Sequence, residues 1–118
     1  MDLTLIKIRR TTWQEFHKDF NPEETKIILK NNRRIGYYAL KNKSDHYYID
    51  NVQISPSMKG KGIGTHILKL IEKQVLKTKT KVIKLEVFKD NPAKKLYERF
   101  NYKLIKDKKT SILMEKKI

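Results

Sequence analysis

Glycines and lysines are concentrated in one short run, Lys59-Gly60-Lys61-Gly62-Ile63-Gly64-Thr65, which holds three of the chain's four glycines. Glycine has no Cβ, so the backbone of such a loop can come close to a ligand. The apolar spacing after the run predicts a helix, and the N–H groups that open a helix attract anions. Lys59 and Lys61 add positive charge. We therefore predict a phosphate-binding loop at a strand-to-helix junction; the alternative is a tight turn that binds nothing.

Two well-known phosphate motifs do not fit this run. A Walker A loop places Gly-Lys-Ser/Thr at the start of the helix, whereas this run continues as Gly64-Thr65-His66. A dinucleotide-binding fingerprint needs a third glycine three positions after the second, and Thr65 stands there. The loop is therefore expected to bind phosphate in a different way from these two classes.

Apolar periodicity and turn residues divide the chain into strands and helices that would position this loop. Strands are predicted at residues 3–8, 26–29, 35–40, 47–54, 82–88, 102–105 and 111–114, and helices at residues 13–20, 63–75 and 93–100. This order predicts an α+β fold, with a mixed, mostly antiparallel sheet of six to seven strands flanked by about three helices. The 118 residues contain no repeat or linker, so residues 1–118 are expected to form a single domain.

Local features refine these elements. Asparagine tolerates the positive φ of a tight hairpin turn, which fits Asn31 and Asn32 between two strands. Asn91 followed by Pro92 is typical of a helix N-cap with proline at the first helical position. Helical spacing predicts a buried stripe of Ile63, Ile67, Leu70, Ile71 and Val75. Alternation along the strand predicted at residues 47–54 places four side chains on one face of the sheet, those of Tyr48, Asp50, Val52 and Ile54.

The charge of the chain suggests a polyanionic partner at first. Lys and Arg number 28 against 13 Asp and Glu, which gives a net charge of +15 and a pI near 10.0. Base readout favours arginine, yet five of the basic residues are arginines and the lysines are spread along the whole chain. A solvated basic surface is therefore the preferred interpretation, and a nucleic-acid-binding module is the less favoured alternative.

Other function classes are disfavoured by composition. The absence of cysteine excludes thiolate nucleophiles, disulfides, iron–sulfur clusters and cysteine zinc sites, and no histidine pair has metal-ligand spacing, so no metal site is predicted. No apolar run approaches the roughly 20 residues that span a bilayer, and the start has no signal-peptide pattern. A cytoplasmic protein without a membrane partner is expected.

Two motifs carry a resemblance to a known family. Ser55-Pro56-Ser57-Met58 followed by the glycine run and a long helix resembles the acetyl-CoA-binding signature of the GNAT superfamily of N-acetyltransferases. Asn91-Pro92-Ala93-Lys94-Lys95-Leu96-Tyr97, and then Phe100-Asn101-Tyr102, resembles that family's second core motif, in which asparagine, alanine, Leu-Tyr and finally Gly-Phe follow in order. Lys59 replaces the family's usual Gln or Arg, and Asn101 replaces its glycine, although asparagine also adopts the left-handed C-cap conformation.

The resemblance implies acetyl-CoA as a cosubstrate and direct transfer of its acetyl group to an amine. It implies that the backbone of residues 59–65 binds the pyrophosphate and that Val52 and Ile54 pair with the pantetheine arm. Asn91 matches a cofactor-contacting asparagine, which is compatible with a helix-capping role. A fold that binds acyl-CoA without turnover is the alternative to an enzyme.

The resemblance also suggests how protons would move. Tyr97 matches the family's tyrosine and is our candidate for the acid that protonates the leaving thiolate, with a plain core residue as the alternative. Asp50 is the candidate base, with a surface acid offsetting nearby lysines as the alternative, and Glu86 is a weaker candidate. The acceptor is left open among a small amine, a peptide and a protein, and a homodimer is compatible with the expected sheet.

Overall fold

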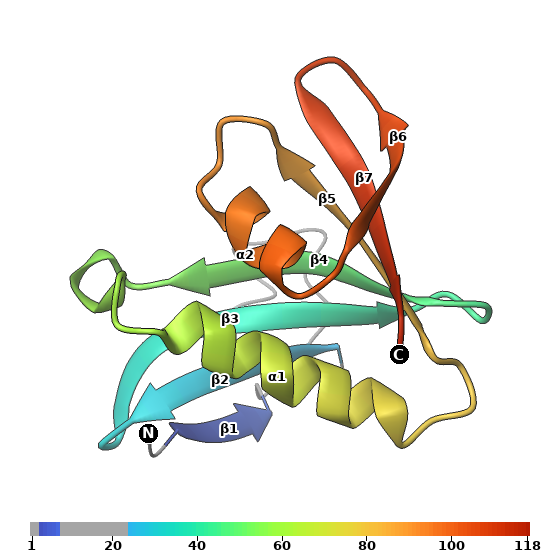
Figure 1. Ribbon diagram of the computed structural model, residues 1–118. Helices are drawn as coiled ribbons and strands as arrows, with labels where there is room; N and C mark the ends of the chain where they lie inside the picture. The colour runs from blue at the N-terminus through green and yellow to red at the C-terminus, as the bar shows by residue number, and fades with distance from the viewer. Residues whose placement is uncertain (1–2, 8–23) are drawn as a thin grey trace, which may run out of the picture.

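Seven strands form one sheet in the computed structural model, which describes residues 3–7 and 24–118. The strands are β1 (Leu3–Lys7), β2 (Thr25–Lys30), β3 (Arg33–Asn42), β4 (Tyr47–Ile54), β5 (Val82–Phe88), β6 (Lys103–Asp107) and β7 (Ser111–Lys117). Their spatial order is β1-β2-β3-β4-β5-β7-β6, and β4–β5 is the parallel pair in an otherwise antiparallel sheet (Figure 1). The predicted fold class is confirmed.

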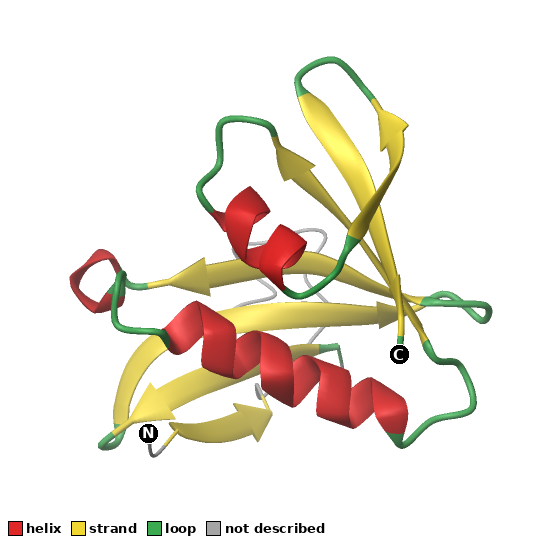
Figure 2. Ribbon diagram, viewed as in Figure 1, coloured by secondary structure: helices red, strands yellow, loops and turns green. Residues whose placement is uncertain are grey.

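Helices interrupt the strand order at two points in the described ranges. A short 3₁₀ helix (Pro56–Met58) and α1 (Ile63–Leu76) join β4 to β5, and α2 (Ala93–Arg99) joins β5 to the β6–β7 hairpin (Figure 2). The helix predicted at residues 13–20 lies outside the described residues. No helix within 3–7 and 24–118 combines the length and apolar character needed to cross a membrane.

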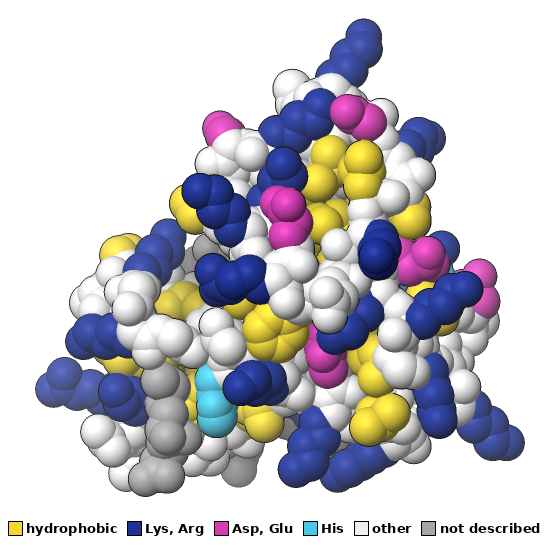
Figure 3. Space-filling view, viewed as in Figure 1, with side chains coloured by type: hydrophobic (Ala, Val, Ile, Leu, Met, Phe, Trp, Pro, Cys, Tyr) yellow, Lys and Arg dark blue, Asp and Glu magenta, His cyan; other side chains and the backbone are white. Residues whose placement is uncertain are grey.

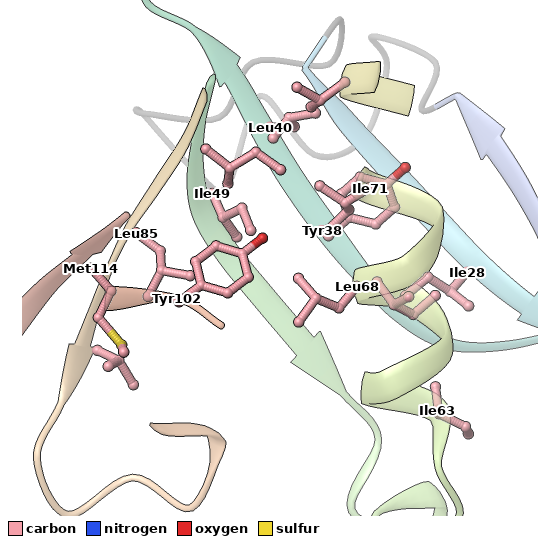
Figure 4. Close-up of a cluster of buried hydrophobic side chains, with 14 of the residues drawn as sticks. Ile28, Tyr38, Leu40, Ile49, Ile63, Leu68, Ile71, Leu85, Tyr102 and Met114 are labelled. Carbon is pink, nitrogen blue, oxygen red and sulfur yellow. The ribbon is translucent and has the colours of Figure 1, made fainter. Parts of the chain in front are cut away.

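Both α-helices cover the same face of the sheet, and the main hydrophobic core lies beneath them (Figures 1 and 4). From α1, the buried side chains are Ile63, Ile67, Leu68, Ile71 and Val75. The predicted stripe is therefore confirmed at four positions. At the fifth, Leu70 is half-buried and Leu68 is buried in the core, because the sheet beneath α1 accepts a wider apolar face than one residue per turn.

The β2–β3 hairpin turns as its two asparagines predict. Asn31 has a φ of 52° and Asn32 a φ of 63°, so both lie in the left-handed region. Two consecutive residues of this kind match the twist of the flanking strands in a two-residue turn. This hairpin fixes the register of β3, which in turn pairs with β4.

A β-bulge interrupts β4 just before the glycine loop. Ala39 pairs with Asn51 and the next residue, Leu40, pairs with Ile49, so Asp50 is an extra residue in β4. A bulge of this kind bends the strand and increases its twist. Asp50 therefore lies at a local distortion of the ladder rather than in regular strand.

The bulge also shifts which residues of β4 face the core. Tyr47 and Ile49 contact the core before the bulge, and Val52 and Ile54 contact it afterwards. The predicted common face for Tyr48, Asp50, Val52 and Ile54 is therefore wrong. Simple alternation fails because the extra residue moves the phase of the strand by one position.

Parallel pairing between β4 and β5 stops at the bulge. The last paired residues are Ile49 and Leu85, although β4 continues to Ile54 and β5 to Phe88. Beyond this point the two strands diverge, as their arrowheads show in Figure 1. Among the described residues, no strand pairs with the β5-facing edge of β4 after Ile49.

The C-terminal end of α2 is closed by a Schellman motif. Asn101 has a φ of 69°, its N–H donates to the Glu98 carbonyl at 3.0 Å, and the N–H of Tyr102 donates to the Tyr97 carbonyl at 3.0 Å. Such a motif brings the residue after the turn back against the last turn of the helix. Here it places the Tyr102 ring against the Tyr97 ring.

The left-handed conformation at Asn101 predicts a substitution series. Asn101→Ala should lower the free energy of unfolding by about 1 kcal/mol, because a Cβ without a local polar group makes this conformation costly. Asn101→Gly should be at least as stable as the natural chain. Urea unfolding measures both, with Lys103→Ala on exposed β6 as the control. Equal stability of the Ala and Gly variants would contradict the assignment.

Candidate active site

The glycine run forms the turn that opens α1. Gly60 has a φ of 79° and Gly62, the N-cap of α1, has a φ of 75°. A Cβ added at either glycine would meet no atom within 4 Å. Glycine is therefore required here by the left-handed backbone and not by crowding within the chain. The side of the loop where these Cβ atoms would stand is open space.

The third glycine has a different role. A Cβ at Gly64 would lie 3.3 Å from Cδ2 of Leu96, on α2, and 3.9 Å from Cδ1 of Ile54. The first turn of α1 therefore packs directly against α2 and the end of β4. The glycine brings together the three elements that carry the predicted site residues.

The start of α1 is well suited to an anion. The N–H of His66 donates to the Gly62 carbonyl at 3.1 Å, which leaves the N–H groups of residues 63–65 without acceptors inside the helix. No acidic side chain lies in the first turn. Lys59 and Lys61 are exposed beside it. The positive end of the helix dipole is thus not offset by local negative charge.

The edge of β4 that leads to this loop presents backbone groups toward β5. The N–H of Ser55 donates to the Ile35 carbonyl at 2.7 Å, so this pair is hydrogen-bonded in the β3–β4 ladder. Hydrogen-bonded and non-bonded pairs alternate in antiparallel sheets. Val52 and Ile54 are therefore non-bonded positions of the β3–β4 ladder. Their N–H and C=O groups point away from β3, toward the edge of β4 that β5 no longer pairs with after Ile49.

Tyr97 lies on α2 and packs against the core. Burial raises the pKa of the Tyr97 hydroxyl, so it remains protonated at neutral pH. Its ring meets the Tyr102 ring edge-on, with 5.7 Å between centroids and 65° between planes. Tyr97 is half-buried rather than fully enclosed, so its hydroxyl is not confined to a structural role.

A partly buried ion pair between Lys116 and Glu72 lies next to the Tyr102 ring. Lys116 Nζ lies 2.9 Å from Glu72 Oε1 and 5.7 Å from the centroid of the Tyr102 ring. Glu72 Oε2 and the Tyr102 hydroxyl are both buried without a hydrogen-bond partner among the described residues. Burial, reinforced by the Glu72 carboxylate, raises the pKa of Tyr102 far above its usual range. Figure 4 shows Tyr102 between Leu85 on β5 and Leu68 on α1.

The two candidate bases have different surroundings. Glu86 has both oxygens engaged, Oε1 by Lys108 Nζ at 2.9 Å and Oε2 by Ser111 Oγ at 2.8 Å. The hydrogen bond from Lys108 and then that from Ser111 lower the pKa of Glu86, which makes it a poorer proton acceptor. Asp50 has a longer ion pair, 3.5 Å from Oδ2 to Lys41 Nζ, and is 42% exposed.

Asn91 uses its side chain as a helix cap. Its Oδ1 accepts the backbone N–H of Ala93 at 2.9 Å, which satisfies one of the free donors at the start of α2. The structure begins α2 at Ala93, so Pro92 immediately precedes the helix instead of forming its first residue. The capping role that the sequence indicates for Asn91 is therefore present, and its amide nitrogen has no part in that bond.

Basic side chains are scattered over the face shown in Figure 3 rather than gathered into one patch. Within residues 3–7 and 24–118, no three His, Asp or Glu side chains come together as a metal site. The candidate groups are therefore the backbone donors at the start of α1, the protonated Tyr97 on α2 and the accessible Asp50 carboxylate on β4. These groups suit binding of a phosphorylated ligand and proton transfer.

Comparison with known proteins agrees with this description. The sequence model of the acetyltransferase (GNAT) family matches residues 4–102, and the chain therefore belongs to this family. No curated protein sequence matches the chain.

Solved structures share the fold at low sequence identity. The ribosomal-protein-S18-alanine N-acetyltransferase of Escherichia coli superposes with a TM-score of 0.81 at 15% identity, covering 99% of this chain and 94% of that one. Naa50 of Arabidopsis thaliana, in complex with the bisubstrate analogue CoA-Ac-MVNAL, has a TM-score of 0.77 at 18% identity, with both chains fully covered. PaiA N-acetyltransferase of Thermoplasma acidophilum, in complex with coenzyme A, has a TM-score of 0.77 at 16% identity, also with both chains fully covered.

Sequence patterns missed the residues that support Tyr97 and Asp50. Glu72, Tyr102 and Lys116 come from three elements and meet through tertiary packing, so no spacing in the sequence indicates the cluster. Lys41 meets Asp50 across the β3–β4 ladder beside the bulge, and the bulge has no distinct sequence signal here. The one available signal was a polar residue, Glu72, adjoining the apolar stripe of α1.

The ion pair behind Tyr102 predicts a measurable cost when one partner is removed. Lys116→Met leaves the Glu72 carboxylate buried with neither oxygen bonded, and should lower the free energy of unfolding by about 1–3 kcal/mol. The double variant with Glu72→Leu should recover part of the loss. Urea unfolding measures both.

Lys94→Met is the matched control, because Lys94 forms an exposed pair with Glu98 at 3.9 Å. It should change stability by less than about 0.5 kcal/mol. An equal loss for Lys94→Met and Lys116→Met would show that burial of the Glu72 pair has no special weight.

Proposed function

We propose that this chain is an N-acetyltransferase that moves the acetyl group of acetyl-CoA directly to an amine. One observation carries the proposal: the edge of β4 that no described strand pairs after Ile49 is followed, after the short 3₁₀ helix Pro56–Met58, by a loop whose two left-handed glycines open α1. Backbone groups at Val52 and Ile54 would bind an extended amide chain, and the donors at the start of α1 would bind phosphate. Family membership and two neighbours solved with CoA-containing ligands support it.

The fit to CoA rests on features of this chain alone. The open space beside Gly60 and Gly62 leaves room for a pyrophosphate close to the backbone. Three N–H groups of α1 and the ammonium groups of Lys59 and Lys61 would bind it there. Asn91, whose Oδ1 is used by the cap, has its amide nitrogen available for the same ligand. Acetyl-CoA would supply an activated thioester.

Proton transfer is assigned to two side chains. Asp50, the first residue beyond the last β4–β5 pair, accepts a proton from the incoming ammonium. Tyr97, which burial keeps protonated, donates a hydrogen bond and then a proton to the sulfur as negative charge develops on it. Glu86 is a weaker choice of base, because Lys108 and Ser111 occupy its oxygens. No covalent enzyme intermediate is needed in this scheme.

The two faces of the sheet would receive different substrates. Tyr97, α1 and α2 lie on one face, whereas Tyr48 lies on the other, because its neighbours Tyr47 and Ile49 face the core. The donor would approach from the helical face and the amine from the opposite face, meeting where β4 and β5 separate. Residues 1–118 would act as one domain.

The experiment that tests this function has two readouts. Acetyl-CoA should raise the melting temperature of the chain, and an amine panel containing peptides and small amines should release free CoA thiol. Stabilisation with no thiol release on any acceptor would support a non-catalytic acyl-CoA-binding domain instead. Binding to nucleic acid that weakens steeply with salt, without any effect of acetyl-CoA, would favour a basic nucleic-acid-binding module.

Substitution of the acid gives a sharper prediction. Tyr97→Phe should lower kcat by about 100-fold, because general acid catalysis contributes at least that factor, and should leave the affinity for acetyl-CoA unchanged. Initial-rate kinetics and calorimetric titration measure the two quantities. Tyr38→Phe is the matched control, since the hydroxyl of this buried tyrosine donates a hydrogen bond to Gln74 Oε1 on α1 at 3.2 Å. An unchanged kcat in Tyr97→Phe would remove Tyr97 from the mechanism.

A further inference from the structure

An amine of the chain itself lies beside the carboxylate that the proposed mechanism uses as the base. Lys41 Nζ lies 3.5 Å from Asp50 Oδ2, and the Lys41 side chain is 29% exposed. Lys41 stands on β3 opposite Tyr48, one pair away from the bulge that sets Asp50 out of the regular ladder. The contact therefore joins neighbouring strands directly beside the bulge.

Lys108 offers a second amine, which pairs with Glu86 at 2.9 Å. The hydrogen bond from Lys108 to Glu86 raises the pKa of Lys108, so this amine is a poorer nucleophile than an unperturbed lysine. Burial raises the pKa of the Tyr48 hydroxyl, and the charges of Glu86 and Asp50 add to this effect while those of Lys108 and Lys41 oppose it.

We propose that Lys41 is an internal acceptor and that the chain acetylates its own Lys41 when no external amine is present. This inference rests on the acetyltransferase function proposed above. The site takes a primary ammonium on an unbranched alkyl chain, which is the chemistry that a lysine side chain presents. External acceptors of the same class, lysine-like primary amines, would replace the Lys41 ammonium beside Asp50.

The step balances in protons and electrons. The Nζ–carbonyl bond forms and the carbon–sulfur bond breaks, with the electron pair leaving on sulfur. Of the three ammonium protons of Lys41, one stays on the new amide and one passes through Asp50 to solvent. The third replaces, by way of solvent, the proton that Tyr97 gives to the thiolate. The products are the Nζ-acetyl-lysine, CoA thiol and one released proton.

Acetylation would change the site that performs it. The modified side chain carries no charge, so its ion pair with Asp50 is lost. The Asp50 carboxylate is then available to an external ammonium. Self-modification would therefore convert a chain whose base is paired with Lys41 into one whose base is free.

The test uses the full chain with acetyl-CoA and no added amine. Intact mass spectrometry should show the gain of one acetyl group, and peptide mapping should place it at Lys41 ahead of Lys108 and exposed Lys103. The rate should be independent of protein concentration over a tenfold dilution, because the donor and acceptor lie in one chain. Lys41→Arg should abolish this fast phase, and Tyr97→Phe should slow it. Label spread evenly over exposed lysines, or a fast phase that persists in Lys41→Arg, would overturn the proposal.

A separate measurement distinguishes this failure from failure of the proposed function. Thermal stabilisation by acetyl-CoA together with acetylation of an external peptide amine, but no label at Lys41, would overturn the internal acceptor alone. Absence of stabilisation and of transfer to any amine would overturn both. Lys43→Arg, in the exposed turn after β3, is the matched control and should leave the labelling of Lys41 unchanged.

Discussion

The extra residue at Asp50 is the constraint on which the site depends. Antiparallel pairing holds β3 to β4 on both sides of it, so the distortion cannot relax by sliding the strand. The consequence appears on the other edge of β4, where parallel pairing with β5 ends at Ile49. The same residue changes the face of the strand, so that Val52 and Ile54 pack on the core while Asp50 meets Lys41. The β4 edge is therefore free of β5 after this extra residue, the Asp50 carboxylate is accessible, and Val52 and Ile54 still pack on the core.

Side-chain packing holds together the elements around the point where β4 and β5 separate. Gly64 lets α1 approach Leu96 on α2, and the Schellman motif at Asn101 turns Tyr102 back against Tyr97. Lys116 on β7 and Glu72 on α1 then hold Tyr102 from the far side. The glycine loop, the proposed acid and the sheet are consequently parts of one packed unit. A change in any contact would displace the acid relative to the loop.

Much of this arrangement could be predicted from the sequence. Within residues 3–7 and 24–118, the order of strands and helices, the Asn31–Asn32 turn, the left-handed glycines before α1 and the left-handed Asn101 follow from local periodicity and backbone preference, and the structure confirms them. The change of face after Asp50 could not be predicted, because a bulge shifts the alternation of a strand without a distinctive residue. The cluster of Glu72, Tyr102 and Lys116 depends on contacts between residues far apart in the chain. The roles of Tyr97 and Asp50 remain predictions from resemblance, supported by burial and position.

The central claim is that one CoA molecule binds both the free β4 edge at Val52 and Ile54 and the backbone N–H groups at the start of α1. Hydrogen exchange of individual backbone amides, measured by NMR with and without saturating CoA, tests it most directly. The account predicts slower exchange at the amides of Val52 and Ile54 together with those of residues 63–65. Protection at the start of α1 with unchanged exchange at Val52 and Ile54 would contradict it, because the ligand would then leave the β4 edge unused.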